Sequence, residues 1–163
     1  MTTKITANDI ADWMTNQIDT DAGDSITHLK LQKLVYYAQA WALVLLDKPL
    51  FEEELQAWAH GPVAVSIFNR FNGFGWQALP VSACDVEFDE DTINVLNEVW
   101  DAYGHMSGKE LEKLTHSEYP WSNARKGLSP EAKSNAVIEK VVIAEFYSRL
   151  YSEASNEVSV AHG

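Results

Sequence analysis

The most constraining feature of this sequence is the stretch from Thr27 to Leu45, where apolar residues recur at helical spacing. One apolar stripe consists of Leu31, Leu34, Val35, Ala38, Trp41 or Ala42, and Leu45. Further apolar side chains widen the stripe, namely Leu29, Tyr36, Tyr37 and Val44. An apolar arc this broad predicts a central helix that packs against neighbours on more than one side.

Start signals predict further helices along the chain. A capping residue or a proline at the first helical position favours starts at Thr6, Thr27, Gly61-Pro62, Asp89 and Ser107, and one more helix is expected over residues 138–151. Residues 55–58 could pair with residues 78–81 as a minor two-stranded element. We therefore expect an all-α fold: one compact domain of about six helices over residues 1–152, followed by a flexible tail over residues 153–163.

Composition excludes several classes of protein. The chain carries 12 basic and 24 acidic residues, a formal net charge of −12, which disfavours binding to nucleic acid phosphates and to anionic membranes. Six Trp, six Tyr and six Phe argue against a disordered acidic coil. The sequence contains neither the roughly 18 consecutive apolar residues of a membrane span nor a signal-peptide core. With one cysteine, Cys84, the chain is expected to be cytoplasmic.

Few residues suggest catalysis. Cys84 lies among acidic residues, which should raise the pKa of its thiol and lower its reactivity. The five histidines are scattered, so we expect no metal site, and no glycine-rich loop indicates a cofactor. His116 and Glu118 beside Trp121 could form an acid–base pair, although a structural role for His116 in the turn around Pro120 is favoured. We therefore expect no catalytic residues.

Three motifs occur in series. The first covers residues 26–39 and includes Leu31-Gln32-Lys33-Leu34-Val35-Tyr36-Tyr37. The second is Ala57-Trp58-Ala59-His60-Gly61-Pro62-Val63. The third covers residues 114–121, includes Thr115-His116-Ser117-Glu118-Tyr119-Pro120-Trp121 and continues to Ala124-Arg125. Together they resemble the Panacea antitoxin domain, also called SocA-like, which occurs in GepA-like phage-associated proteins. The resemblance extends over about residues 5–150. It implies an antitoxin that neutralises a cognate protein toxin, encoded by the adjacent gene, through direct binding. It attributes no catalytic residue, cofactor or metal to the chain.

The motif residues divide into candidate contacts and structural positions. Tyr36 and Tyr37 are adjacent on a helix and point about 100° apart, so both are not expected to be fully buried. With Lys33, which could pair with an acid, and His60, they are the candidate partner-binding residues. The remaining motif residues are expected to be structural: Leu31, Leu34, Trp58, Gly61, Pro62, Val63, Thr115, His116, Pro120 and Trp121.

Three alternatives remain beside sequestration of a toxin. The chain could be an adaptor that delivers the toxin to an ATP-dependent protease. It could be an acidic, phage-encoded decoy that inhibits nucleic-acid enzymes. It could also be an enzyme, with His116, Glu118 and Cys84 as the candidate residues. An acidic partner would gain electrostatic steering toward a basic toxin face, which favours the antitoxin.

Overall fold

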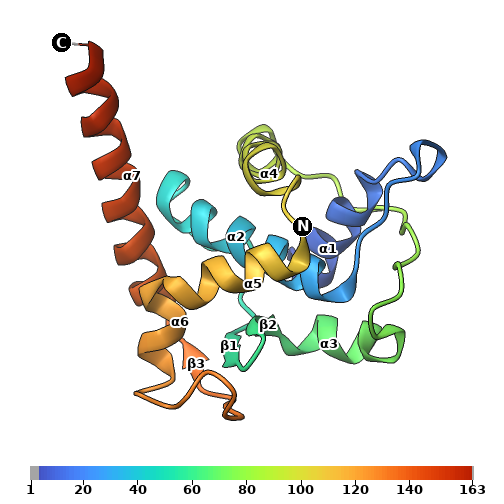
Figure 1. Ribbon diagram of the computed structural model, residues 1–163. Coiled ribbons are helices and arrows are strands. Elements are labelled where there is room, and N and C mark those ends of the chain that lie inside the picture. The colour runs from blue at the N-terminus through green and yellow to red at the C-terminus, as the bar shows by residue number, and fades with distance from the viewer. Residues whose placement is uncertain (1–3, 163) are drawn as a thin grey trace.

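A computed structural model describes residues 4–162, with side chains described as far as residue 156, and is mostly helical (Figure 1). The described part contains seven α-helices: α1 (Ala7–Asn16), α2 (His28–Leu45), α3 (Val65–Phe71), α4 (Glu90–Tyr103), α5 (Gly108–Ser117), α6 (Tyr119–Ala124) and α7 (Lys140–His162). Three strands form one small sheet: β1 (Leu55–Trp58), β2 (Gly61–Ala64) and β3 (Val137–Ile138). The prediction of a mostly helical fold is confirmed.

Side-chain caps begin the helices where the sequence predicts them. Thr6, Thr27, Asp89 and Ser107 each accept a hydrogen bond from the backbone N–H three residues further along the chain. At Thr6 and Ser107 the acidic residue at the third helical position bonds back to the cap, which completes a capping box. These contacts are local, so the helix starts follow from the sequence alone.

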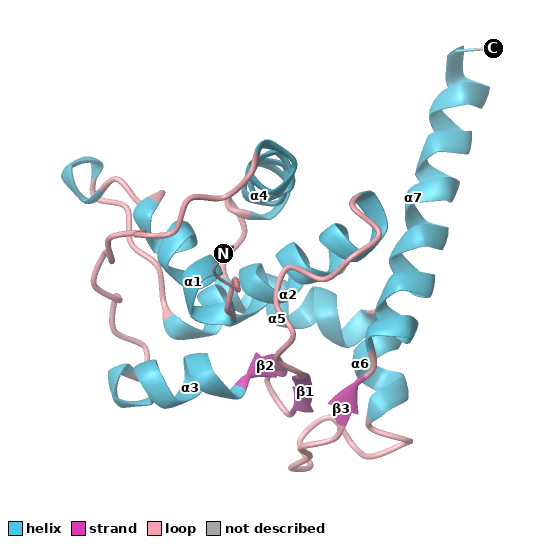
Figure 2. Cartoon of the chain, turned by 180° about the vertical axis from the view of Figure 1, so that it is seen from behind, coloured by secondary structure: helices cyan, strands magenta, loops and turns pink. Residues whose placement is uncertain are grey.

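Helix α2 is the centre of the molecule, as its broad apolar arc predicts. Helices α1, α4, α5 and α7 all pack against it (Figures 1 and 2). Leu31, Leu34, Val35 and Ala38 are completely buried in the core. The core continues without a break from Ala7 in α1 to Tyr147 in α7, so both terminal helices belong to the same packed unit.

Tyr36 and Tyr37 are both buried, with 1% and 0% of their surface exposed, and the expectation that at least one is exposed is wrong. Neighbours on several sides of α2 cover the adjacent rings, and each hydroxyl group has a buried partner: Glu118 for Tyr37 and the Tyr147 hydroxyl group for Tyr36. Glu118 Oε1 accepts hydrogen bonds from Tyr37 Oη at 2.6 Å and from Tyr147 Oη at 2.9 Å. The Tyr36 and Tyr147 hydroxyl oxygens are 3.0 Å apart. Burial raises the pKa of the Glu118 carboxyl group.

The sheet differs from the predicted two-stranded element. β1 pairs with β2 as an antiparallel hairpin and with β3 on its other edge, instead of with residues 78–81. Gly61-Pro62 begins strand β2, not a helix, and α3 starts only at Val65. The cause is tertiary, because the Gln32 side chain on α2 accepts from Ala64 N at 2.9 Å and donates to Ala64 O at 3.3 Å, which holds β2 extended.

Two features near the C-terminus also depart from the prediction. A turn was expected around Pro120, but the structure has a short helix there, α6. Pro120 lies in the first turn of α6, where its missing N–H has no cost. Helix α7 starts after Ile138, because Ile138 pairs with Leu55 in the sheet, and it continues past Tyr151 to His162. The described residues of the expected tail therefore extend α7, while the flexibility of residues 153–163 stays a prediction. Residue 163 lies outside the described residues.

Among residues 4–162, no helix has the length and apolar character needed to cross a membrane.

Candidate partner-binding surface

The three sequence motifs converge on the β1–β2 hairpin. From α2, Lys33 Nζ donates to Pro62 O at 3.1 Å in the middle of β2. From α6, Trp121 Nε1 donates to Trp58 O at 2.8 Å at the end of β1. These contacts join segments about 30 to 60 residues apart, so the hairpin is positioned by the helices on either side of it.

Gly61 makes the closest of these approaches. Its φ is +107°, a left-handed conformation that L side chains rarely adopt. A Cβ atom there would lie 2.5 Å from Lys33 Cε and 3.0 Å from Thr115 Oγ1. Pro62 and Val63, the next residues of β2, are buried. Gly61 is therefore required by both the backbone conformation and the space between α2 and α5.

Trp121 and Arg125 secure the other side of the hairpin. The Trp121 ring stacks on His116 with a centroid distance of 3.8 Å, and the Arg125 guanidinium lies 4.7 Å from the Trp121 ring centroid. Arg125 is buried and donates to Ala57 O of β1 and to Ser129 O of the following loop, both at 2.8 Å. Burial lowers the pKa of His116. These geometries give the third motif a structural role.

Lys33 is completely buried beneath the hairpin. Burial lowers the pKa of its amine to about 7, an effect that the nearby Glu112 carboxylate partly opposes. Under neutral conditions a substantial fraction of the amine is therefore uncharged, and its one described hydrogen bond is to Pro62 O. In this position Lys33 supports the hairpin from inside.

The Lys33 amine should make stability depend on pH. Unfolded, its pKa is near the ordinary 10.5, so between pH 7 and 10.5 the unfolded chain binds a proton that the native chain does not. The free energy of unfolding should therefore rise with pH in this window, by at most about 1.4 kcal/mol per pH unit. Lys33→Met should remove this rise, and the exposed Lys113→Met should retain it, as measured by urea unfolding at several pH values. Equal pH slopes for wild type and Lys33→Met would contradict the assignment.

The outer side of the hairpin is hollowed on both flanks. One hollow, of about 300 Å³, is lined mainly by aromatic and apolar side chains, among them Trp58, His60, Val63, Phe68 and Trp76. A second hollow, of about 680 Å³, lies between the same hairpin and the loop of residues 131–135. Trp76 is 67% exposed, so a large aromatic side chain stands at the edge of an apolar hollow. We call the hairpin with Trp58, His60, Phe68 and Trp76 the hairpin surface.

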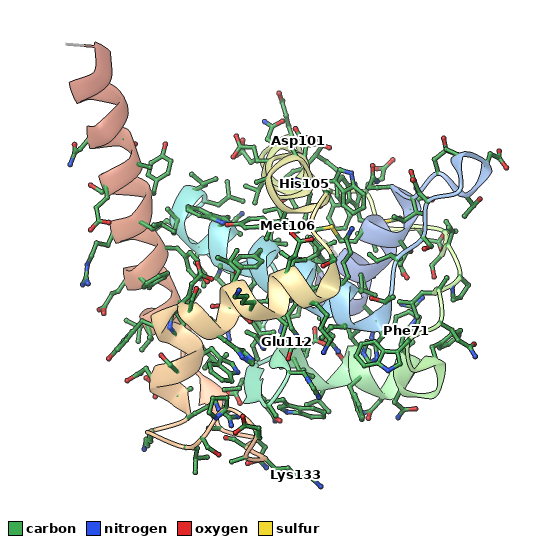
Figure 3. All side chains as sticks on the ribbon, viewed as in Figure 1. Phe71, Asp101, His105, Met106, Glu112 and Lys133 are labelled. Atoms are coloured by element: carbon green, nitrogen blue, oxygen red, sulfur yellow. The ribbon has the colours of Figure 1, made fainter. Side chains whose placement is uncertain are left out.

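A polar rim borders the hairpin surface. His60 Nδ1 and Glu112 Oε1 are 3.0 Å apart, and Lys109 Nζ lies 3.3 Å from the other oxygen of Glu112. The same Lys109 nitrogen is 5.1 Å from the Trp76 ring centroid, a cation–π contact. In the view of Figure 3, Glu112 on α5 lies above the hairpin and Lys133 lies on the loop below it. An apolar centre with a charged rim is the common arrangement of protein–protein interfaces.

The structure separates the four candidate partner-binding residues. His60 is exposed on the hairpin surface, whereas Lys33, Tyr36 and Tyr37 are buried and can act only by supporting the surfaces above them. Sequence analysis did not single out Phe68 and Trp76, which the structure places on the hairpin surface. The signal for Trp76 was its place directly after Gly73 and Gly75, in a segment with no apolar periodicity to bury it.

The candidate catalytic side chains His116 and Glu118 do not contact each other as an acid–base pair. Glu118 accepts hydrogen bonds from two buried tyrosines, while His116 stacks on Trp121, so each side chain is engaged by a different group. Burial, before any effect of neighbouring acids, raises the pKa of the Cys84 thiol. No group of three or more His, Cys, Asp or Glu side chains in the described part of the chain could hold a metal ion.

A comparison with protein families decides the identity of this domain. The family model described as "Antitoxin SocA-like, Panacea domain" matches residues 31–122, which is more than half of the chain. The chain belongs to this antitoxin family. The match begins at Leu31, within the first motif, and includes the hairpin and Trp121, so the resemblance of the sequence to this family is confirmed. No curated protein and no solved structure is significantly similar to the chain.

Several elements outside the matched residues 31–122 pack against the matched part of the chain. Helices α1 and α7 lie outside the matched residues, yet both pack on α2, the first matched element. Arg125, which holds β1 from inside, also lies just beyond the match. The segments that flank the matched region therefore complete the core of this Panacea domain.

Proposed function

We propose that this Panacea domain is an antitoxin that neutralises a cognate protein toxin by direct binding through the hairpin surface. The observation that carries the proposal is the exposed Trp76 at the edge of an apolar hollow. It shares this hollow with His60 of the hairpin, the element where all three family motifs meet. The partner is the toxin encoded by the adjacent gene, and binding takes place in the cytoplasm. No catalytic step is part of this function.

The chemistry of the hairpin surface suits a protein partner. Tryptophan at the centre of an interface commonly contributes more than 2 kcal/mol to binding when water is excluded around it. Trp58 and Phe68 are only half-buried, with ring centroids 4.7 Å apart, so a partner side chain that enters the hollow would meet two aromatic rings. The rim of Lys109, Glu112 and His60 would orient that partner.

The net charge of −12 supports the same proposal through association kinetics. Toxins that act on nucleic acids or nucleotides carry basic substrate-binding faces, and an acidic partner is attracted to such a face over a distance of about one Debye length. Sequestration should leave the half-life of the toxin in cells unchanged. Delivery to an ATP-dependent protease would shorten it, which distinguishes the two mechanisms.

Substitution of Trp76 tests the function directly. Co-expression with the product of the adjacent gene should restore growth, and Trp76→Ala should weaken the purified complex by about 30-fold or more and abolish this rescue. Binding is measured by isothermal titration calorimetry, and rescue by growth on plates. Because Trp76 packs little within the domain, the variant should unfold at nearly the wild-type temperature.

Tyr119→Ala is the matched control. Tyr119 is 56% exposed and lines neither hollow, so its removal should leave both affinity and rescue unchanged. Equal effects of the Trp76 and Tyr119 substitutions would place the interface elsewhere. Absence of a complex with the neighbouring gene product, together with absence of rescue, would contradict the antitoxin function itself.

A further inference from the structure

A second apolar groove lies away from the hairpin, between α2, α4 and α7. The groove measures about 200 Å³ and is lined by Trp41 and Leu45 of α2, Val99, Ala102 and Tyr103 of α4, and Tyr151 of α7. Its one charged lining residue is Glu98. Trp41 Nε1 donates to Tyr103 Oη at 2.9 Å, so the polar atoms of the groove floor are paired with each other and its surface is apolar.

Helix α7 forms one wall of the groove with an unpartnered face. Figures 1 and 2 show its distal half standing away from the other helices, and residues 148–156 are all exposed. Beyond the buried Tyr147, the exposed Leu150, Tyr151 and Ala154 continue the same helix face, and Tyr151 meets Trp41 at the groove. An isolated stretch of helix this short is marginally stable in water, so a helix laid against this face would stabilise it.

The other wall of the groove is acidic. Between residues 85 and 103 the chain contains seven acidic residues and no basic one. Of these, the exposed Glu98 on α4 lines the groove, whereas Asp101 lines a different hollow, beside Trp100 and Gly104. On α7, Glu145, Arg149 and Glu153 lie on the side of the helix opposite the Tyr147–Tyr151 face. The charge at the groove therefore comes from α4 and is negative.

We propose that this groove binds an amphipathic helix with basic flanks that belongs to the cognate toxin. The apolar face of that helix would cover Trp41, Val99 and Tyr151, and its Lys or Arg residues would meet the α4 acids, in the helix-in-groove mode of recognition. The inference rests on the proposed function, because the toxin supplies the helix. It adds a second contact region to the hairpin surface.

Charge selects this occupant over a second copy of the chain. A second copy would bring the same α4 acids toward the groove of the first, and like charges placed opposite each other at an interface cost several kcal/mol. Tyr37 lies beneath the groove, where it stacks on Tyr103 with ring centroids 4.1 Å apart, and Tyr36 packs edge-on against Tyr37. The tyrosine pair of the first motif thus supports the groove floor.

The test uses the full chain and synthetic peptides, so it is independent of the toxin. A helical peptide of about 18 residues with a Leu/Ile face and Lys flanks should bind, and the same peptide with Glu flanks should bind about 10-fold more weakly or not at all. Ala102→Arg, which fills the groove, should weaken binding of the Lys-flanked peptide about 10-fold. Asn97→Arg adds the same charge to α4 outside the groove and should have little effect.

Charge reversal completes the experiment. Glu98→Lys, at the one charged residue of the groove lining, should weaken binding of the Lys-flanked peptide and remove its preference over the Glu-flanked peptide. Equal binding by wild type and Ala102→Arg, or equal binding of the two peptides to wild type, would overturn the proposal. A dimer in light scattering that Ala102→Arg dissociates would also overturn it, because the occupant would then be a second copy. None of these outcomes depends on the Trp76 growth test, so failure of the groove and failure of the antitoxin function can be told apart.

Discussion

Replacing Arg125 by methionine is expected to lower the free energy of unfolding by about 3–5 kcal/mol, the largest effect of any single substitution considered for this domain. Arg125 is 2% exposed, and its guanidinium donates to the carbonyl oxygens of Ala57, Ser129 and Ala132. Methionine fills a similar volume and donates no hydrogen bond. Each buried carbonyl left without a partner costs about 1–3 kcal/mol, reduced where the loop can open to water.

Two control variants separate hydrogen bonding from charge. Arg125→Lys keeps the charge but cannot reach several carbonyls at once, so an intermediate loss is expected. Lys126→Met makes the corresponding change at the exposed neighbouring position and should alter stability by less than about 0.5 kcal/mol. Urea unfolding followed by tryptophan fluorescence measures all three variants. An Arg125→Met protein as stable as Lys126→Met would show that the carbonyl contacts contribute nothing.

Gly61→Ala is expected to cost about 2–4 kcal/mol and to displace the hairpin. Two effects add at this position: the φ of +107° is strained for alanine, and the new Cβ would come within 2.5 Å of Lys33 Cε. Lys33 is completely buried, so it can yield only by moving the groups packed around it. Because the hairpin carries Trp58 and His60, the same substitution should also weaken toxin binding.

Gly23→Ala is the matched control for Gly61→Ala. Gly23 also has a positive φ, of +85°, but no atom of the described structure lies within 4 Å of an added Cβ. The decrease in the free energy of unfolding caused by Gly23→Ala should therefore reflect backbone strain alone, at about 1 kcal/mol. The difference between the two variants in thermal and urea unfolding isolates the cost of the close approach to Lys33. Equal losses would mean that the neighbouring side chains move aside at no cost.

Lys33 and Gly61 are in contact beneath the hairpin, so the pH dependence of stability and the effect of Gly61→Ala both report on this contact. A partner that presses on the hairpin surface acts on a strand whose backbone is bonded to a buried amine. Lys33 is therefore best described as a positioning residue for the hairpin. The binding roles remaining in the proposal belong to His60, Trp76 and the half-buried aromatic side chains beside them.

Several parts of the fold could be predicted because their causes are local. Thr6, Thr27, Asp89 and Ser107 cap helices through contacts made within three residues, which a sequence displays directly. The apolar arc around Leu34 predicted a helix surrounded by others for the same reason, since helical periodicity is a property of one segment. The wrong predictions concern pairing over long separations, such as Leu55 with Ile138.

The sequence by itself determined that this chain forms a helical Panacea domain with an acidic exterior. Helix caps, apolar periodicity and each motif depend only on residues that are close together in the sequence. Only the tertiary structure decided which of the motif side chains a partner can touch. Tyr36 and Tyr37 can be buried because residues far along the chain pair with their hydroxyl groups: Glu118 accepts from Tyr37, and Tyr147 pairs directly with Tyr36. Trp76, in the loop between α3 and α4, is left 67% exposed by its neighbours. Burial is set by what the rest of the chain places nearby, and that depends on contacts between distant segments.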